Sequence, residues 1–297
     1  MNSTKEKSIK KDKLILNKVK LLEDNDVKEF VNFLAEKWDE GLKFNVGIKK
    51  RGSKAVYIPI VSLKDMLDNY YWEYSINTSP KDFPKDSYKG STLNESEAVL
   101  SYCKNKLINN KGINTNEDEL RVGTEIVFRW GGVFTKGNKI KATDKNYDLQ
   151  KDYKEVIQKW NNIYSKNADF SSRDKFDFTS NAGFTKVYSL ILPDFIIYDS
   201  RVSVALAYLI NLCFNGIIPE ILNIYIPAPR GVNTERRTVN SSFLPTNQNN
   251  SRHFYSNVIA SLLLSESLKL ISDKDNTVKL RDLEASLFMM GYDVSRS

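Results

Sequence analysis

Two charged residues, Lys186 and Asp199, lie at the starts of two apolar segments within residues 181–213, NAGFTKVYSLILPDFIIYDSRVSVALAYLINLC. Pro193 separates the segments. Apolar side chains recur at helical spacing after Asp199. An aspartate at such a start is typical of an N-cap, where its carboxylate accepts hydrogen bonds from unpaired backbone N–H groups. The pattern predicts two consecutive helices, over residues 184–192 and 200–213, that meet at a tight corner.

A lysine and an aspartate in these places are candidate catalytic residues. A lysine whose pKa is lowered by burial can act as a nucleophile and form a Schiff base, and a carboxylate can stabilise positive charge on a sugar. The alternative is structural. Asp199 would then only cap its helix, Lys186 would extend from an apolar helix to water, and Arg201 would pair with a nearby carboxylate. The spacing of 13 residues leaves open whether Lys186 and Asp199 converge.

This arrangement resembles the core of the helix-hairpin-helix DNA glycosylases. GFTK (183–186) stands where that superfamily carries a GVGRKT-like turn, and YDSRV (198–202) stands where it carries a VDTHV-like one. The resemblance covers roughly one tenth of the chain. It implies that the turn containing Gly183 binds the phosphate backbone, that Lys186 attacks the sugar and that Asp199 completes the site. The chain also resembles an uncharacterised bacterial group that shares FTKVYSL, IYDSRV and LEASLFMMGY.

The bulk composition favours an anionic partner. The chain has 297 residues, is 41% hydrophobic and carries a formal net charge of +7. This balance favours nucleic acid first, with DNA as the expected partner and RNA left open, and a membrane surface second. A lysine-rich composition inherited from an AT-rich genome would give the same balance.

Several cofactor classes are disfavoured. Two cysteines exclude a four-cysteine zinc or iron–sulfur site within one chain. A single histidine, His253, argues against a histidine metal site or a catalytic triad. We therefore expect no cofactor and no metal. With no recognisable signal peptide and no apolar run of spanning length, we expect a cytoplasmic protein that does not bind membranes.

The periodic segments predict a mainly α fold with a helix-hairpin-helix glycosylase-like core. Residues 1–13 form a predicted basic tail and residues 14–297 a single helical domain, with 14–90 as a candidate subdomain. Helices are predicted over residues 14–22, 26–41, 62–74, 92–107, 117–130, 153–164, 253–271 and 280–291. The minor β elements are a hairpin of residues 43–48 and 54–60 and a strand over 221–226. Loops are predicted over residues 75–90, 109–116, 135–148 and 230–252.

Basic residues at predicted turns and loops are candidates for binding nucleic acid, because a guanidinium fork matches phosphate and an unusually long loop is often functional. They are Lys49, Lys50 and Arg51 in the hairpin turn, Arg201 beside Asp199, and Arg230, Arg236, Arg237 and Arg252 in the long loop.

Aromatic and glycine-rich segments are pocket candidates. The aromatic residues at 70–74 can stack on bases or seal an edge of the core. Arg129 and Trp130 precede Gly131 and Gly132, which allow a close backbone approach and so predict a pocket. A helix C-cap with a core tryptophan is the alternative.

The sequence thus predicts a DNA-binding protein with base-excision activity, as an N-glycosylase with or without lyase activity, through Lys186 and Asp199. Such chemistry requires an unpaired or flipped base and a pocket for it. Two alternatives stay open, and whether the protein is an enzyme stays open with them. One is a non-catalytic protein that binds nucleic acid or another partner with the same helical core. The other is a nucleotide or small-molecule enzyme built around the arginine-rich loop.

Overall fold

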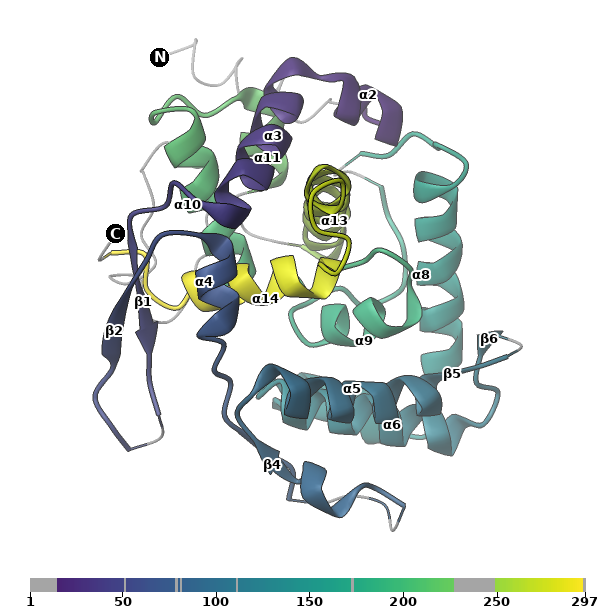
Figure 1. Cartoon of the computed structure of the whole chain (residues 1–297). Coiled ribbons are helices and arrows are strands. Elements are labelled where there is room, and N and C mark those ends of the chain that lie inside the picture. Colours follow the sequence, from purple (N-terminus) through teal and green to yellow (C-terminus); the bar gives the residue numbers. More distant parts are fainter. Residues whose placement is uncertain are drawn as a thin grey trace, which may run out of the picture.

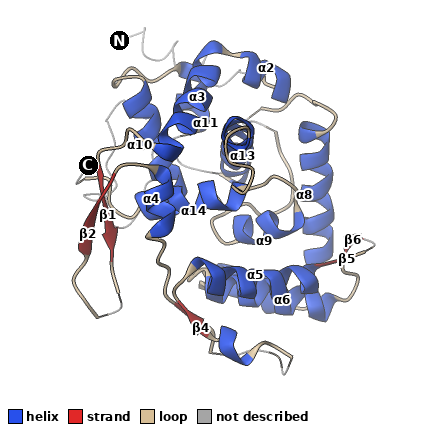
Figure 2. Cartoon of the chain, viewed as in Figure 1, coloured by secondary structure: helices blue, strands red, loops and turns tan. Residues whose placement is uncertain are grey.

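The computed structural model describes residues 15–50, 52–77, 80, 82–110, 112–171, 174–226 and 249–295, and it is mainly helical (Figures 1 and 2). The longer helices are α3 (Asn25–Asp39), α5 (Leu93–Leu107), α6 (Glu117–Trp130), α7 (Lys136–Thr143), α8 (Leu149–Tyr164), α9 (Phe184–Ile191), α10 (Ser200–Cys213), α13 (Asn250–Ser272) and α14 (Leu280–Met290). The short helical elements are α2 (Lys18–Glu23), α4 (Leu63–Asp68), α11 (Glu220–Tyr225) and the 3-10 turn η1 (Lys85–Ser87).

The β structure is confined to three antiparallel pairs. They are β1 (Phe44–Ile48) with β2 (Val56–Ile60), β3 (Tyr74–Ser75) with β4 (Lys89–Gly90), and β5 (Ile108–Asn109) with β6 (Gly112–Ile113). The β1–β2 hairpin projects from one side of the helical body, and β4 lies below it in the same view (Figure 1).

Helix α13 forms the centre of the core, and Figure 1 shows it end-on in the middle of the molecule. Most of its residues are buried on every face, as expected of a helix surrounded by other helices. Helices α3, α11 and α14 pack against it. One contiguous apolar cluster, which includes Leu16 near the start and Val294 near the end of the described chain, holds these elements together.

The corner between α9 and α10 is fixed by side chains from three other helices. Trp160 Nε1 of α8 donates to the carbonyl of Pro193 at 2.9 Å. The backbone N–H of Ile196 donates to Ser261 Oγ of α13, and that of Ile197 donates to Glu284 Oε2 of α14. The corner is therefore positioned by parts of the chain that are distant in sequence.

Several sequence predictions are confirmed. The fold is mainly α, and α9 and α10 are consecutive helices joined by a short corner. β1 and β2 form the predicted hairpin. The predicted helix over 92–107 is α5, which begins with a capping box between Thr92 and Glu95.

Other predictions of local structure are wrong. The predicted strand over 221–226 is helix α11, because a short apolar run fits either structure and Leu222 is buried in this helix. The predicted loop over 135–148 contains α7, in which Asn138 Nδ2 donates a hydrogen bond to the Val133 carbonyl. The predicted helix over 62–74 ends at Asp68, and the aromatic residues after it form an irregular segment that leads into β3.

The remaining corrections concern boundaries. The predicted loops over 75–90 and 109–116 contain the two-residue strands of the second and third pairs. The helix predicted over 26–41 begins one residue earlier, because the carboxylate of Asp24 accepts the N–H groups of Asp26 and Val27 and so caps α3. Arg252 lies in the first turn of α13 rather than in a loop.

The central position of α13 predicts a large difference between two leucines of this helix. Leu262 is 1% exposed and Leu270 is 38% exposed. We expect Leu262→Ala to lower the free energy of unfolding by about 2–5 kcal/mol, because it leaves a cavity in the core. Leu270→Ala should change it by less than about 1 kcal/mol. Urea unfolding of both variants measures this, and equal losses would contradict a core centred on α13.

Candidate functional site

Lys186 and Asp199 meet at the start of α9 and α10. Lys186 Nζ lies 3.1 Å from Asp199 Oδ2, and the two side chains are only 4% and 13% exposed. Lys186 Nζ also donates to the Ala182 carbonyl at 3.2 Å. The interpretation in which Lys186 reaches water is therefore wrong, because the side chain ends inside the protein.

Asp199 serves two roles through its two oxygens. Oδ1 accepts the backbone N–H groups of Arg201 and Val202 at 2.9 and 3.3 Å, which is the predicted N-cap, while Oδ2 pairs with Lys186. Burial alone would raise the pKa of Asp199, but the Lys186 ammonium, the Arg201 guanidinium and the hydrogen bonds to the carboxylate together hold this pKa below its usual value. Asp199 is thus a carboxylate at neutral pH despite its burial.

The glycine pair after α6 makes room for the lysine. Gly131 is the C-cap of α6, and a Cβ at this position would overlap the side chain of Lys186. A Cβ on Gly132, which has φ +65°, would lie 3.5 Å from the Trp72 ring. The close approach predicted for this pair is therefore an approach to Lys186 and Trp72.

A small cavity of about 10 Å³, lined in part by both members of the ion pair, lies beside it. This is roughly the volume that one water molecule requires. Trp130 Nε1 and Arg281 Nε, which belong to residues of this lining, find no acceptor among the described residues. The lining consists of Tyr70, Trp72, Trp130, Lys186, Ile197, Asp199, Arg281, Glu284 and Phe288.

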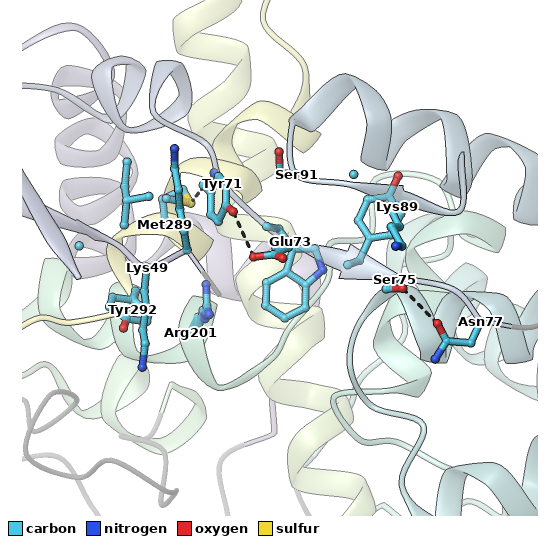
Figure 3. A pocket seen from close by; sticks show the side chains of 16 residues that line it. Lys49, Tyr71, Glu73, Ser75, Asn77, Lys89, Ser91, Arg201, Met289 and Tyr292 are labelled. Atoms are coloured by element: carbon cyan, nitrogen blue, oxygen red, sulfur yellow. Dashed lines mark hydrogen bonds between the residues drawn. The ribbon is translucent and has the colours of Figure 1, made fainter. Parts of the chain in front are cut away.

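An open pocket of about 930 Å³ shares Trp72 with the lining of the small cavity. Figure 3 shows the side chains that line this open pocket. The cationic and aromatic side chains of this pocket come from the β1–β2 turn, the segment that leads into β3, strand β4, the start of α10 and the end of α14. The lining consists of Gly47, Ile48, Lys49, Lys50, Tyr71, Trp72, Glu73, Tyr74, Ser75, Asn77, Lys89, Gly90, Ser91, Arg201, Met289 and Tyr292.

Aromatic rings hold Arg201 in this pocket. Its guanidinium carbon lies 4.3 Å from the centroid of the Phe288 ring and 5.2 Å from those of Trp72 and Tyr292. Such cation–π contacts fix the position of a guanidinium without neutralising its charge. Arg201 therefore connects the open pocket with the N-terminus of α10, where Asp199 lies.

The structure brings some of the predicted binding residues together and separates others. Lys49, Lys50 and Arg201 share the open pocket. Gly183 does not line it, and its N–H donates to Asn181 Oδ1 at 2.8 Å, so this amide is already occupied and not presented to a phosphate.

The predicted pocket residues Arg129 and Trp130 lie in different environments. Trp130 is buried and lines the small cavity, whereas Arg129 pairs with Glu125 and stacks on Phe134. Arg252 lies at the start of α13 and lines neither the small cavity nor the open pocket. Arg51, Arg230, Arg236 and Arg237 lie outside the described residues, so the role of the arginine-rich loop stays a prediction.

Several site residues escaped the sequence interpretation. Glu284 and Phe288 line the small cavity, and Met289 and Tyr292 line the open pocket. All four belong to the segment LEASLFMMGY, which the sequence analysis singled out without assigning it a role. The sequence did not indicate Lys89 as a pocket residue, because its strand β4 pairs with β3 over only two residues and leaves no recognisable pattern.

His253 is a further neighbour of the ion pair. Its Nδ1 lies 2.9 Å from Ser180 Oγ. Burial, together with the Lys186 ammonium, lowers the pKa of His253 to about 4, although the Asp199 carboxylate acts in the opposite direction. His253 is thus a neutral imidazole at neutral pH.

Comparison with known proteins finds no match: no protein-family model, no curated protein and no solved structure is similar to this chain. Within the described part of the chain, no helix is both long and apolar enough to cross a membrane. The same residues contain no group of three or more His, Cys, Asp or Glu side chains placed to hold a metal ion.

The buried ion pair predicts strong coupling between its partners. Lys186→Met leaves a buried carboxylate without its cation, and Asp199→Asn leaves a buried ammonium without its anion, so each should cost about 3–5 kcal/mol of unfolding free energy. The double variant should cost less than the sum of the two, with a coupling of roughly 0.5–3 kcal/mol.

A second ion pair supplies the control for this cycle. Lys159 and Asp174 lie at the same distance of 3.1 Å, but their side chains are 29% and 31% exposed. The corresponding Met and Asn variants should couple by less than about 1 kcal/mol. Strict additivity at Lys186 and Asp199 in urea unfolding would show that the pair does not stabilise the fold.

His253 predicts a distinct dependence of stability on pH. Between about pH 6.5 and about pH 4 the imidazole of the unfolded chain binds a proton, whereas the imidazole of the folded protein stays neutral. The free energy of unfolding therefore decreases progressively as the pH falls through this window. We expect the unfolding free energy of the wild type to fall more steeply than that of His253→Asn in this window, by up to about 1.4 kcal/mol per pH unit. Parallel curves from chemical unfolding at several pH values would contradict the burial of a neutral imidazole.

Proposed function

We propose that this protein is a DNA base-excision enzyme with a helix-hairpin-helix glycosylase-like core, in which Lys186 and Asp199 act on the sugar of an unpaired nucleotide. The observation that carries the proposal is the 3.1 Å contact between Lys186 Nζ and Asp199 Oδ2 at the starts of two consecutive helices. The adjoining open pocket, with Lys49, Lys50 and Arg201 beside aromatic rings, has the composition expected of a nucleic-acid site.

The two side chains supply the groups that the reaction requires. Before Lys186 can attack the sugar C1′, its ammonium must give up a proton, and Asp199 Oδ2 lies within reach of direct transfer. A bond from Nζ to C1′ then forms while the bond from C1′ to the base breaks, and the proton leaves with the base. Opening of the sugar ring gives the Schiff base, which either hydrolyses or permits strand cleavage.

Access to the pair determines whether this chemistry occurs. The cavity of about 10 Å³ is too small for a base, so a substrate has to displace part of its lining. Trp72 is the residue shared with the open pocket, and it lies in an irregular segment between α4 and β3. Its Nε1 donates to the Trp130 carbonyl at 2.9 Å, so its displacement breaks this hydrogen bond.

The small cavity also favours a second candidate function. A nucleic-acid-binding protein that keeps the same core without catalysis would retain the open pocket and hold Lys186 and Asp199 only as a structural pair. In that case a substrate never reaches Nζ of Lys186. The two candidates differ in covalent chemistry and not in binding.

Borohydride trapping on DNA with an abasic site tests the proposal without knowledge of the base. The wild type should form a covalent adduct, because reduction fixes the Schiff base. Lys186→Gln should abolish the adduct, and so should Lys186→Arg, which keeps the positive charge but provides no amine of comparable reactivity. Asp199→Asn should reduce trapping by orders of magnitude, with circular dichroism confirming that each variant is folded.

Lys159→Gln is the matched control, since it removes a lysine from an ion pair of the same length outside the site. It should trap like the wild type. Trapping that survives Lys186→Gln would assign the nucleophile elsewhere. If the wild type neither traps on abasic DNA nor releases a base from a panel of damaged and modified duplexes, the non-catalytic binding function replaces this one.

A further inference from the structure

The open pocket carries its positive charge in two separated places. Lys49 and Arg201 lie on one side of the pocket in Figure 3, and Lys89 of β4 lies on the other. Lys50 adds to the first group from the β1–β2 turn. Within the described residues, none of the three lysines forms an ion pair, so their charge is available to an anion.

Polar and aromatic groups occupy the space between these cations. Tyr71 and Glu73 lie there, and the Tyr71 hydroxyl donates to Glu73 Oε2 at 3.2 Å (Figure 3). The Glu73 carboxylate repels a phosphate at the middle of the pocket, whereas it can accept an N–H group of a base. Aromatic rings such as those of Tyr71 and Tyr292 can stack on bases of any sequence.

This distribution fits an extended ligand better than a compact one. A triphosphate would concentrate its negative charge near Glu73, but a nucleic-acid strand places a base between two flanking phosphates. The volume of about 930 Å³ is at the upper end of the usual range for small-ligand pockets, which agrees with a nucleoside and its two phosphates. A paired base in a duplex cannot present its face to side chains inside such a hollow.

We infer that the open pocket binds an unpaired nucleotide within a single strand, with one flanking phosphate on Lys49, Lys50 and Arg201 and the other on Lys89. The base lies over Tyr71 and Glu73. This inference takes its ligand class from the proposed function but does not depend on catalysis. It also assigns strand binding to the open pocket rather than to the turn at Gly183, whose amide is already bonded within the protein.

Fluorescence anisotropy with a labelled single-stranded oligonucleotide tests the assignment. The double variant Lys49→Glu/Lys89→Glu should weaken binding at least about tenfold and should reduce the slope of log K against log salt by about 1.4, since each phosphate contact to a single strand contributes about 0.7. Lys28→Glu/Lys154→Glu changes the net charge equally on exposed parts of α3 and α8, outside the pocket lining. This control should leave the salt slope nearly unchanged.

Competition distinguishes the possible ligands of the pocket. Unlabelled single strand should displace the labelled strand at lower concentration than a duplex of the same sequence or ATP. Equal losses in the two double variants, or stronger competition by duplex or ATP, would overturn the inference.

The outcome remains separable from that of the catalytic proposal. Lys159→Gln, which changes an ion pair outside both sites, should bind the strand like the wild type. If the pocket variant binds normally while the wild type still traps on abasic DNA, the inference fails and base excision survives. Pocket-dependent binding without trapping or base release supports the inference and leaves the non-catalytic function.

Discussion

The buried contact between Lys186 and Asp199 constrains the structure around it. Removing two charges from water costs several kcal/mol for each ion unless both are paired and hydrogen-bonded. Here the carboxylate receives two helix N–H groups as well as the ammonium, and the ammonium also bonds to Ala182. Gly131 leaves the space that the lysine stem occupies. The start of α9, the start of α10 and the end of α6 are therefore placed together by one ion pair.

The ion pair depends in turn on contacts that reach across the fold. The corner before Asp199 is held by Ser261 of α13 and Glu284 of α14, so the two central helices determine where the carboxylate lies. On the other side, Asn138 of α7 accepts a hydrogen bond from Asn181, which in turn accepts the N–H groups that begin α9. Both charges are consequently held in place before any substrate arrives, which is the condition for electrostatic preorganisation.

Local signals in the sequence were sufficient for the parts of this site that depend on neighbouring residues. The N-cap at Asp199, the capping box at Thr92 and the basic β1–β2 turn follow from short patterns. Convergence of Lys186 with Asp199 did not follow, because it depends on contacts from residues more than sixty positions away. Helix α11 was mispredicted as a strand, and the irregular aromatic segment after α4 was mispredicted as helix. Both errors arise because the structure of a short apolar run is decided by its tertiary packing and not by its local pattern.

In the part of the chain that the structure describes, the hydrogen-bonding groups around the ion pair are not all satisfied by the protein itself. Trp130 Nε1–H and Arg281 Nε–H find no acceptor among the described residues, and an unpaired buried donor costs about 1–3 kcal/mol. One acceptor atom in the hollow, which has about the volume of a water molecule, would offset this cost. The low-dielectric surroundings that make the ion pair expensive to form also strengthen its field on whatever group lies beside it.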